Sequence, residues 1–233
     1  MHTHVFSTRE KMGQAAGSAV EERINALLNE QDELRMIFAA APSQNEVLDY
    51  LAQSKQIDWS KITAFHMDEY IGLPADAPQR FATFLKERLF DRVTLRAVHL
   101  IVGDDNPEQE CQRYADLLAE KPIDIVCLGI GENGHIAFND PPVADFEDPQ
   151  LVKVVELDAR CRQQQVNDGC FTSLGTVPTQ AITLTIPTLM SGNYLYCVVP
   201  GPTKREAVDN TLNGPISTDC PASILRTHQN CQL

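Results

Sequence analysis

The chain has 233 residues, and 43% of them are hydrophobic, which is enough for one sizeable core. Its 32 acidic and 19 basic residues give a net charge of −13. This balance argues against a nucleic acid or an anionic membrane surface as the partner, although it permits a small anionic substrate. No apolar run approaches the length that spans a bilayer, and the amino end shows no basic region followed by an apolar one. We therefore expect a cytoplasmic protein, whose seven cysteines, with no Cys-x-x-Cys pair among them, are reduced and buried.

The chain begins with a predicted helix, strand and helix. Apolar residues recur at helical spacing over residues 8–30, after a capping box that starts at Ser7. Residues 34–40 are a short apolar run, which is typical of a buried strand. A second capping box starts at Ser43 and predicts a helix that ends near residue 53.

The turn over residues 39–44 is a candidate phosphate-binding element. It joins the strand to the second helix, and the backbone N–H groups at a helix start have no partner within the helix. Ser43 and Gln44 are therefore candidate phosphate contacts.

A second apolar strand ends in two adjacent carboxylates. Residues 62–67 predict this strand, and Asp68 and Glu69 follow it in a predicted loop that runs to residue 74. Adjacent acids after a strand are usually just a solvated loop. The apolar strand before them, and the glycine and proline that follow closely, favour a functional site instead.

The middle of the chain predicts two helices and a strand. Residues 79–90 predict a helix, and residues 98–102 predict a short strand. The turn at residues 103–107 leads into a polar helix that ends near residue 120. The side chains expected to face inward from the first helix are Phe81, Phe84, Leu85, Leu89 and Phe90.

The most informative stretch is an apolar strand followed by a polar loop rich in glycine. Residues 123–130 are apolar except for one aspartate, which is typical of a strand buried on both faces of a parallel sheet. The next ten residues present Asn133, His135, Asn139 and Asp140 at the carboxyl end of this strand, where open α/β sheets bind ligands. The glycine spacing matches neither a dinucleotide fingerprint nor a P-loop. A loop histidine is most often structural, but its place between Asn133 and Asp140 favours a proton-transfer group held by partners.

A polar helix is predicted over residues 158–169, after an acidic loop at 145–149 and a strand at 151–157. It contains Arg160, Arg162 and three glutamines, a composition that a polar surface helix would share. Because the chain has few basic residues, two arginines here favour a phosphate contact, for which arginine has a suitable bidentate geometry. We choose Arg162, with Arg160 as the alternative.

The last part of the chain predicts two strands, at 181–186 and 193–199, and two helices. One helix starts within residues 200–205 and the other covers residues 219–227. Lys204 lies at the start of the first helix, where the helix dipole disfavours a cation. An anion bound nearby would explain its position.

Strands and helices alternate from end to end, and no repeat, long linker or low-complexity tract divides the chain. The sequence therefore predicts an α/β fold, with a mostly parallel sheet, helices on both faces and a single domain over residues 1–233. No cluster of metal-ligating residues stands out in the sequence, so we expect neither a metal nor an organic cofactor.

Two separated stretches resemble signatures of the glucosamine-6-phosphate deaminase (isomerase) family. Residues 65–74 read Phe-His-Met-Asp-Glu-Tyr-Ile-Gly-Leu-Pro, and residues 128–141 read Leu-Gly-Ile-Gly-Glu-Asn-Gly-His-Ile-Ala-Phe-Asn-Asp-Pro. The resemblance covers nearly the whole chain and implies the Rossmann-like fold of sugar-phosphate isomerases. It also implies an enzyme that converts glucosamine 6-phosphate to fructose 6-phosphate and ammonia, and it implies no metal or cofactor.

The resemblance implies a role for individual residues of the two signatures. Asp68 would move a proton between C1 and C2 of the sugar, with Glu69 as a support or a substrate contact. His135 would open the sugar ring, oriented by Asp140 and Asn133. Many relatives have an aspartate in place of Asn133, and an amide can orient an imidazole without stabilising its charged form.

The resemblance also implies how the substrate phosphate is held. An arginine from residues 158–169, together with Lys204, would bind it at the turn over residues 39–44. That turn usually reads Gly-Gly-Thr-Pro in the family, and this chain has no glycine in it.

Three alternatives stay open. A 6-phosphogluconolactone hydrolase would resemble this chain around the Gly-His loop but would not need the signature at Asp68. A deaminase for the galactosamine epimer would need the same residues. A non-catalytic sugar-phosphate sensor would not need both Asp68 and His135, and any of these proteins could be a homo-oligomer.

Some deaminases of the family are activated at a second site by an acetylated amino-sugar phosphate, through basic residues just after the ring-opening loop. Here residues 142–150 hold three acids, and the first basic residue after them is Lys153. The segment would repel a phosphate, so we expect no such activation.

Overall fold

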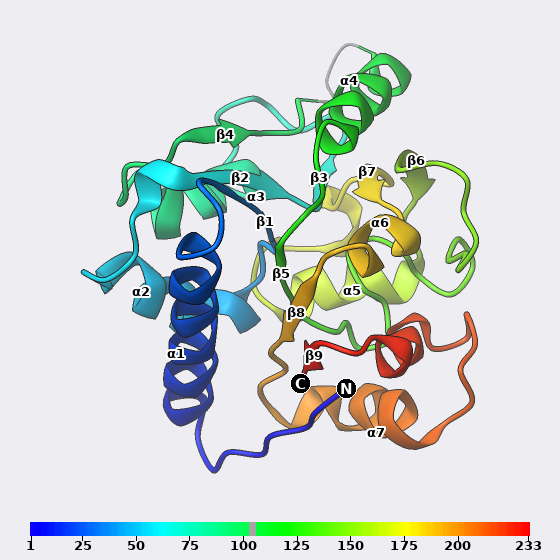
Figure 1. Ribbon diagram of the computed structural model, residues 1–233. Coiled ribbons are helices and arrows are strands. Elements are labelled where there is room, and N and C mark those ends of the chain that lie inside the picture. The colour runs from blue at the N-terminus through cyan, green and yellow to red at the C-terminus, as the bar shows by residue number, and fades with distance from the viewer. Residues whose placement is uncertain (103–105) are drawn as a thin grey trace.

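The computed structural model describes residues 1–102 and 106–233, so the predicted turn at residues 103–105 lies outside the described residues. Its centre is a six-stranded sheet in the order β4–β2–β1–β5–β8–β9, and every neighbouring pair of strands is parallel (Figure 1). The predicted parallel sheet is therefore confirmed. Its strands are β1 (Leu34–Phe38), β2 (Ile62–His66), β4 (Ala97–His99), β5 (Ile125–Leu128), β8 (Tyr194–Cys197) and β9 (Cys231–Gln232).

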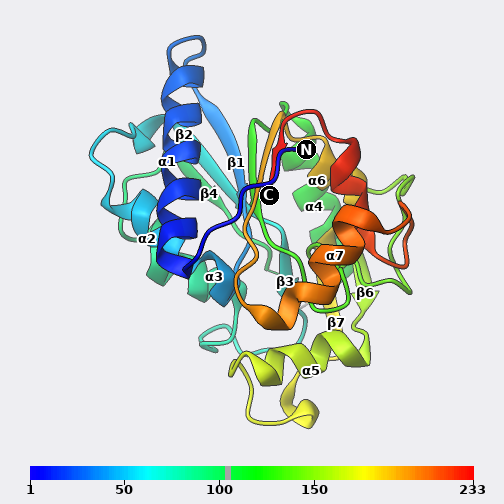
Figure 2. The same cartoon turned by 90° about the horizontal axis from the view of Figure 1, so that it is seen from below.

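Helices cover both faces of this sheet, as predicted, and Figure 2 shows the two layers on opposite sides of it. One layer contains α1 (Arg9–Leu28), α2 (Asn45–Gln53) and α3 (Phe81–Leu85), which continues as a π-helical turn to Phe90. The other layer contains α4 (Pro107–Ala119), α6 (Ile186–Met190) and α7 (Arg205–Asn213).

The central strands are buried on both sides because alternate side chains enter different cores. In β1, Met36 and Phe38 belong to the core beneath α1 and α2, whereas Ile37 belongs to the core beneath α4 and α6. All three side chains are fully buried. This arrangement explains why these strands are continuous apolar runs rather than alternating ones.

A second, smaller sheet was not predicted. It is antiparallel, in the order β3–β7–β6, and consists of β3 (Asp68–Tyr70), β7 (Gln180–Leu184) and β6 (Val152–Glu156). Only Met67 separates β2 from β3, so Asp68 begins the second sheet where the first one ends. The prediction of a loop from residue 68 onward was therefore wrong at its first three positions. The remaining helix, α5 (Ala159–Asn167), follows β6 in the chain.

The predicted helix starts differ from the observed ones in their caps. Thr8, rather than Ser7, caps α1, because its hydroxyl oxygen accepts the N–H of Lys11 at 3.3 Å. Ser43 does not cap α2, which follows a 3₁₀ turn over Pro42–Gln44 without a side-chain cap. The last predicted helix is a 3₁₀ helix over Pro221–Thr227. Short 3₁₀ turns also cover Trp59–Lys61, Leu174–Thr176 and Pro202–Lys204.

The seven cysteines are all free, and six of them are buried, as predicted; Cys170 is partly exposed. Within the described parts of the chain, no helix combines the length and the apolar character needed to cross a membrane.

Candidate active site

A cavity of about 520 Å³ opens at the carboxyl ends of four strands of the large sheet. Residues 39–43 line it after β1, Met67 and Asp68 after β2, and residues 129–131 after β5. After β8 the lining residues are 200, 201, 203 and 204. This edge is where a parallel sheet offers free backbone groups and loops to a ligand. The volume lies within the usual range for small-molecule sites.

His135 lies in the wall of this cavity and is held by two partners. Its Nδ1 atom is 2.7 Å from Asn133 Oδ1 and 2.9 Å from Asp140 Oδ1. Asn133 Nδ2 also donates to Asp140 Oδ1 at 2.9 Å, which closes a three-residue network. Since both partners of Nδ1 are acceptors, Nδ1 carries a ring proton, and in the neutral form of the imidazole the free lone pair is on Nε2. The structure thus brings together the three residues that the sequence singled out in this loop.

The backbone of the loop fits the imidazole closely at Gly131. A Cβ atom at that position would lie 2.1–2.4 Å from three atoms of the His135 ring, so the ring packs directly on the backbone. Gly134 has a φ of +83°, which glycine adopts at little cost. Asn139 fastens the far side of the loop, since its Nδ2 donates to Ile136 O and Leu184 O at 3.0 and 2.9 Å.

Asp140 is fully buried and remains ionised. Burial by itself would raise its pKa, but the hydrogen bond and charge of His135, followed by the hydrogen bond from Asn133, lower the pKa below its usual value. A carboxylate in this place stabilises a positive imidazole, which the neutral amide of Asn133 does not do.

Asp68 lines the same cavity from the start of β3 and is 6% exposed. Among the described residues, no hydrogen bond or ion pair engages its carboxyl group, which leaves it available to a ligand. Burial and then the adjacent Glu69 raise the pKa of Asp68 well above its usual value. A carboxyl group in this environment is a stronger base than an exposed aspartate.

Lys204 lines the cavity from the loop after β8. It is only 8% exposed, and its ammonium group makes no hydrogen bond or ion pair within residues 1–102 and 106–233. Burial lowers its pKa, while Asp168 and Glu132 act in the opposite direction. A buried lysine without a close partner is well suited to an anionic ligand.

Comparisons with known proteins agree with this geometry. The family model described as glucosamine-6-phosphate isomerases/6-phosphogluconolactonase matches residues 7–233. The chain belongs to this family.

Two curated relatives carry the name glucosamine-6-phosphate deaminase. The one from Bacillus cytotoxicus is 34% identical over 233 residues, which cover 99% of this chain and 84% of the relative. The one from Exiguobacterium sibiricum is 38% identical over 179 residues, or 76% of this chain and 69% of the relative.

Solved structures show the same fold. A monomeric glucosamine-6-phosphate deaminase is 30% identical with a TM-score of 0.89, over 100% of this chain and 95% of that one. A 6-phosphogluconolactonase from Thermotoga maritima has a TM-score of 0.81 at 21% identity, over 99% of this chain and 97% of that one, which shows a shared fold only.

Glu69 was predicted to be a support or a substrate contact, and it does not line the cavity. Glu69 accepts the N–H groups of Tyr70, Phe81 and Ala82 at 2.9–3.1 Å, and its carboxylate lies 3.7 Å from the Arg80 guanidinium. It therefore supports the start of α3, which is one of the two roles considered for it. Burial raises the pKa of Glu69, and these backbone hydrogen bonds work against that rise.

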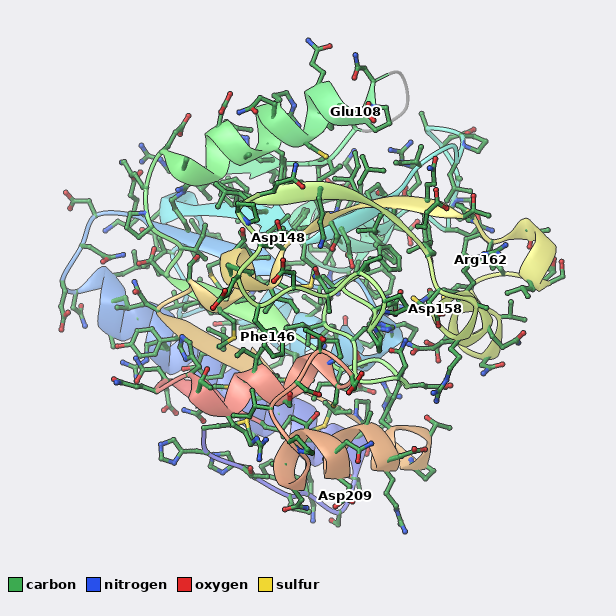
Figure 3. The ribbon with its side chains drawn as sticks, turned by 90° about the vertical axis from the view of Figure 1, so that its right-hand side faces the viewer. Glu108, Phe146, Asp148, Asp158, Arg162 and Asp209 are labelled. Carbon is green, nitrogen blue, oxygen red and sulfur yellow. The ribbon has the colours of Figure 1, made fainter. Side chains whose placement is uncertain are left out.

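Arg162 was chosen as a phosphate contact, and the structure places it outside the cavity. Its guanidinium donates to the carbonyls of Leu174 and Val177, both at 2.8 Å, and Figure 3 shows it beside the turn that follows α5. Arg162 thus holds that turn. Arg160, the alternative, does not line the cavity either.

The predicted phosphate turn is only partly in place. Ser43 lines the cavity, whereas Gln44 does not. The buried side chain of Gln44 donates to Leu128 O at 3.1 Å and to Ser43 Oγ at 3.2 Å, so it ties the turn to the end of β5.

Several polar residues that line the cavity were not predicted from the sequence. Among them are Gln164 and Gln165 on α5, and Arg9 at the start of α1. Gln164 holds the loop that carries His135, because its Oε1 accepts the N–H of Glu132 at 2.8 Å. Helical spacing could have found the glutamines: Cys161, the pair at 164 and 165, and Asp168 share one face of α5, and Arg162 does not.

Proposed function

We propose that this family member is a glucosamine-6-phosphate deaminase, which converts glucosamine 6-phosphate and water to fructose 6-phosphate and ammonia. The observation that carries the proposal is one cavity lined by His135 in its network, by Asp68 without a partner, and by the buried Lys204. Relatives of that name match nearly the whole chain.

His135 opens the sugar ring in this proposal. Its Nε2 lone pair accepts the proton of the hydroxyl on C1 and delivers a proton to the ring oxygen, which gives the open aldehyde. Asp140 stabilises the transient imidazolium and, with Asn133, fixes the ring plane. Because the pKa of Asp140 is lowered, its carboxylate is charged when His135 takes the proton.

Asp68 carries out the isomerisation. It removes the proton from C2 of the open amino sugar and returns a proton to C1, while the nitrogen on C2 loses a proton and the oxygen on C1 gains one. The result is an imine at C2 and a hydroxyl at C1. Water then hydrolyses the imine, and the products are a ketone at C2 and ammonia. The raised pKa of Asp68 suits this step, since a carbon acid requires a base stronger than an exposed carboxylate.

Lys204 binds the phosphate, with Ser43 and Arg9 near it in the cavity wall. The Arg9 guanidinium already pairs with Glu46 at 2.9 Å and donates to Pro42 O at 2.7 Å, so it also orders the turn that carries Ser43. Gln165, whose side-chain amide has no hydrogen bond in the described part of the chain, is a further donor in this wall.

We further propose that residues 1–233 act as one domain, because loops after strands of the large sheet and the first residue of β3 in the small sheet line one cavity. A homo-oligomer stays a prediction; the 30% identical solved relative is described as monomeric. A sugar phosphate is the proposed partner, and the cytoplasm is the proposed location.

One experiment tests the reaction and the alternatives together. The purified protein is given glucosamine 6-phosphate, galactosamine 6-phosphate or 6-phosphogluconolactone, and ammonia, fructose 6-phosphate and lactone hydrolysis are measured. We expect ammonia and fructose 6-phosphate in equal amounts from glucosamine 6-phosphate. Faster turnover of the lactone would favour a hydrolase, and binding without turnover would favour a sensor.

A further inference from the structure

We propose that His135, Asp140 and Cys161 form a binding site for a thiophilic divalent cation such as Zn²⁺, and that the bound ion reversibly inhibits the protein. This site goes beyond the proposed reaction, which requires no metal. It rests on the arrangement of three side chains from the ring-opening loop and α5.

The three side chains meet in the protein interior. One ring nitrogen of His135, one carboxylate oxygen of Asp140 and the Cys161 sulfur all lie within 4.8 Å of one another. The three residues are 8%, 0% and 1% exposed. Imidazole, carboxylate and thiolate are the ligands that Zn²⁺ takes in proteins, and three of them with one open position make a common zinc site.

A second observation comes from the unused oxygen of Asp140. Its Oδ1 atom interacts with both Asn133 and His135, whereas Oδ2 is buried and accepts no N–H or O–H group in the described parts of the chain; the only further donor beside this carboxyl group is the weak Cys161 thiol. A buried carboxylate oxygen without a strong donor is costly. A cation next to Oδ2 would remove this cost.

The charges around Cys161 also favour a cation. Its neighbours include the carboxyl groups of Asp140, Asp68 and Asp158. These negative groups would attract a divalent ion, and the ion would in turn stabilise the thiolate.

The site would close by a small movement. With zinc bonds of about 2.0 Å to nitrogen and oxygen and about 2.3 Å to sulfur, tetrahedral ligand atoms are about 3.5 Å apart. The three ligand atoms lie within 4.8 Å of one another, so side-chain shifts on the order of 1 Å would bring them to this separation. Rotation of the Cys161 and Asp140 side chains would supply them.

Inhibition follows from the change in the protonation of His135 when the ion binds. On binding, the Cys161 thiol loses its proton to solvent, and the His135 proton moves from Nδ1 to Nε2 while Nδ1 binds the ion. Nε2 then faces the cavity with a hydrogen instead of a lone pair. His135 can no longer accept a proton from a sugar hydroxyl.

Cobalt binding tests the site without any sugar present. Co²⁺ is titrated into the full protein, and the sulfur-to-cobalt charge-transfer absorption is recorded together with displacement by Zn²⁺. We expect one ion per chain with this absorption. In Cys161→Ala the absorption should disappear, and the affinity should fall about ten-fold or more. Cys170→Ser is the matched control, because Cys170 is more exposed and lies near the same cavity but outside the cluster.

The proposal is overturned if Cys161→Ala keeps the absorption, if Cys170→Ser loses it, or if the wild type binds no Co²⁺ or Zn²⁺ at millimolar concentration. If Cys161→Ala does not fold, zinc X-ray absorption of the loaded wild type decides instead. One sulfur with nitrogen and oxygen ligands supports the site, and a first shell without sulfur sinks it. Inhibition of ammonia release by Zn²⁺, weakened in Cys161→Ala and unchanged in Cys170→Ser, is the functional readout.

Discussion

Two buried aspartates contribute to the same site with opposite electrostatics. Burial and Glu69 raise the pKa of Asp68, whereas His135 and Asn133 outweigh burial and lower the pKa of Asp140. One carboxyl group is thus prepared to take up and return a proton, and the other to remain charged beside an imidazole. This division fits the two proton transfers of the proposed reaction.

Asp68→Asn should abolish turnover while leaving substrate binding nearly intact. The amide keeps the shape of the side chain but cannot accept the C2 proton, so kcat should fall by about 10²–10⁴-fold. Ammonia release measures kcat, and calorimetric titration with the substrate measures binding. A variant that kept more than about half of its turnover would show that another group is the base.

Lys204→Ala should raise KM for the phosphorylated substrate by about ten-fold or more, because a charge-assisted contact to phosphate contributes about 1.5–3 kcal/mol. Arg162→Ala is the matched control: it removes a cation that donates to Leu174 O and Val177 O, outside the cavity. Its KM should stay close to that of the wild type even if its melting temperature falls. Equal KM values for wild type and Lys204→Ala would place the phosphate elsewhere.

At the scale of whole elements, the sequence predicted those with a strong periodic signal and missed those held by distant partners. The run at residues 123–130 gave β5 and its loop because apolar residues and glycines mark both. β3 has no such signal: Asp68, Glu69 and Tyr70 become a strand only by pairing with β7, far along the chain. The two-residue strand β9 is too short to show any pattern.

The sequence grouped residues that the structure brings together where one loop supplies its own partners, and it selected a residue that the structure places outside the cavity where the register of a helix decides. Asn133, His135 and Asp140 are near neighbours in sequence, so their contact required only a tight loop. On α5, the charge of Arg162 suggested a phosphate contact, but its direction around the helix axis sends it to the 174–177 turn. The charge of a side chain indicates which ligands it can bind, and its position around the helix axis decides which groups it can contact.

The segment after the ring-opening loop should not bind a phosphate activator. Its nearest cation, Lys153, is already occupied, since its Nζ atom lies 2.7 Å from Asp148 Oδ2 and donates to Val143 O at 2.7 Å. We therefore expect hyperbolic saturation with the substrate, unchanged by N-acetylglucosamine 6-phosphate. Initial rates with and without that compound measure this. A sigmoidal curve that the compound makes hyperbolic would reveal a second site.

At the scale of the whole molecule, the order of the predicted elements along the chain indicated the fold class. The alternation of strands and helices was enough for a parallel sheet with two helical layers, and the second sheet was missed because its strands are separated in sequence. The acidic character is spread over the surface: in Figure 3, Glu108, Asp148, Asp158 and Asp209 come from different parts of one face.

His66 should make the fold sensitive to acid. It is fully buried in β2, where its Nε2 accepts the N–H of Ile101 at 2.7 Å, and burial, helped by Arg80, lowers its pKa from 6.5 to about 3. Between these values the unfolded chain binds a proton that the folded chain does not, so stability falls as the pH drops below 6.5. From about pH 7 to about pH 5, this group alone removes about 2 kcal/mol.

Urea unfolding at several pH values measures this loss. His66→Gln, whose side-chain oxygen can accept the Ile101 N–H, should flatten the profile by about that amount. His4→Gln, which replaces an exposed histidine, should keep the wild-type slope. If His66→Gln and His4→Gln gave the same slope, His66 would not be the source.

The position of the site between the two sheets bears on how activity is lost on heating. Asp68 pairs with Thr183 of β7, and the His135 loop is joined to the same strand through the Phe138 N–H, which donates to Thr183 Oγ1 at 3.1 Å, and through Asn139. The proposed base and the histidine proposed to open the ring are therefore fixed to one shared strand, so neither can loosen unless β7 leaves its place. Thermal inactivation should then coincide with cooperative unfolding followed by circular dichroism, and activity that disappeared well below that transition would show that the loop melts independently.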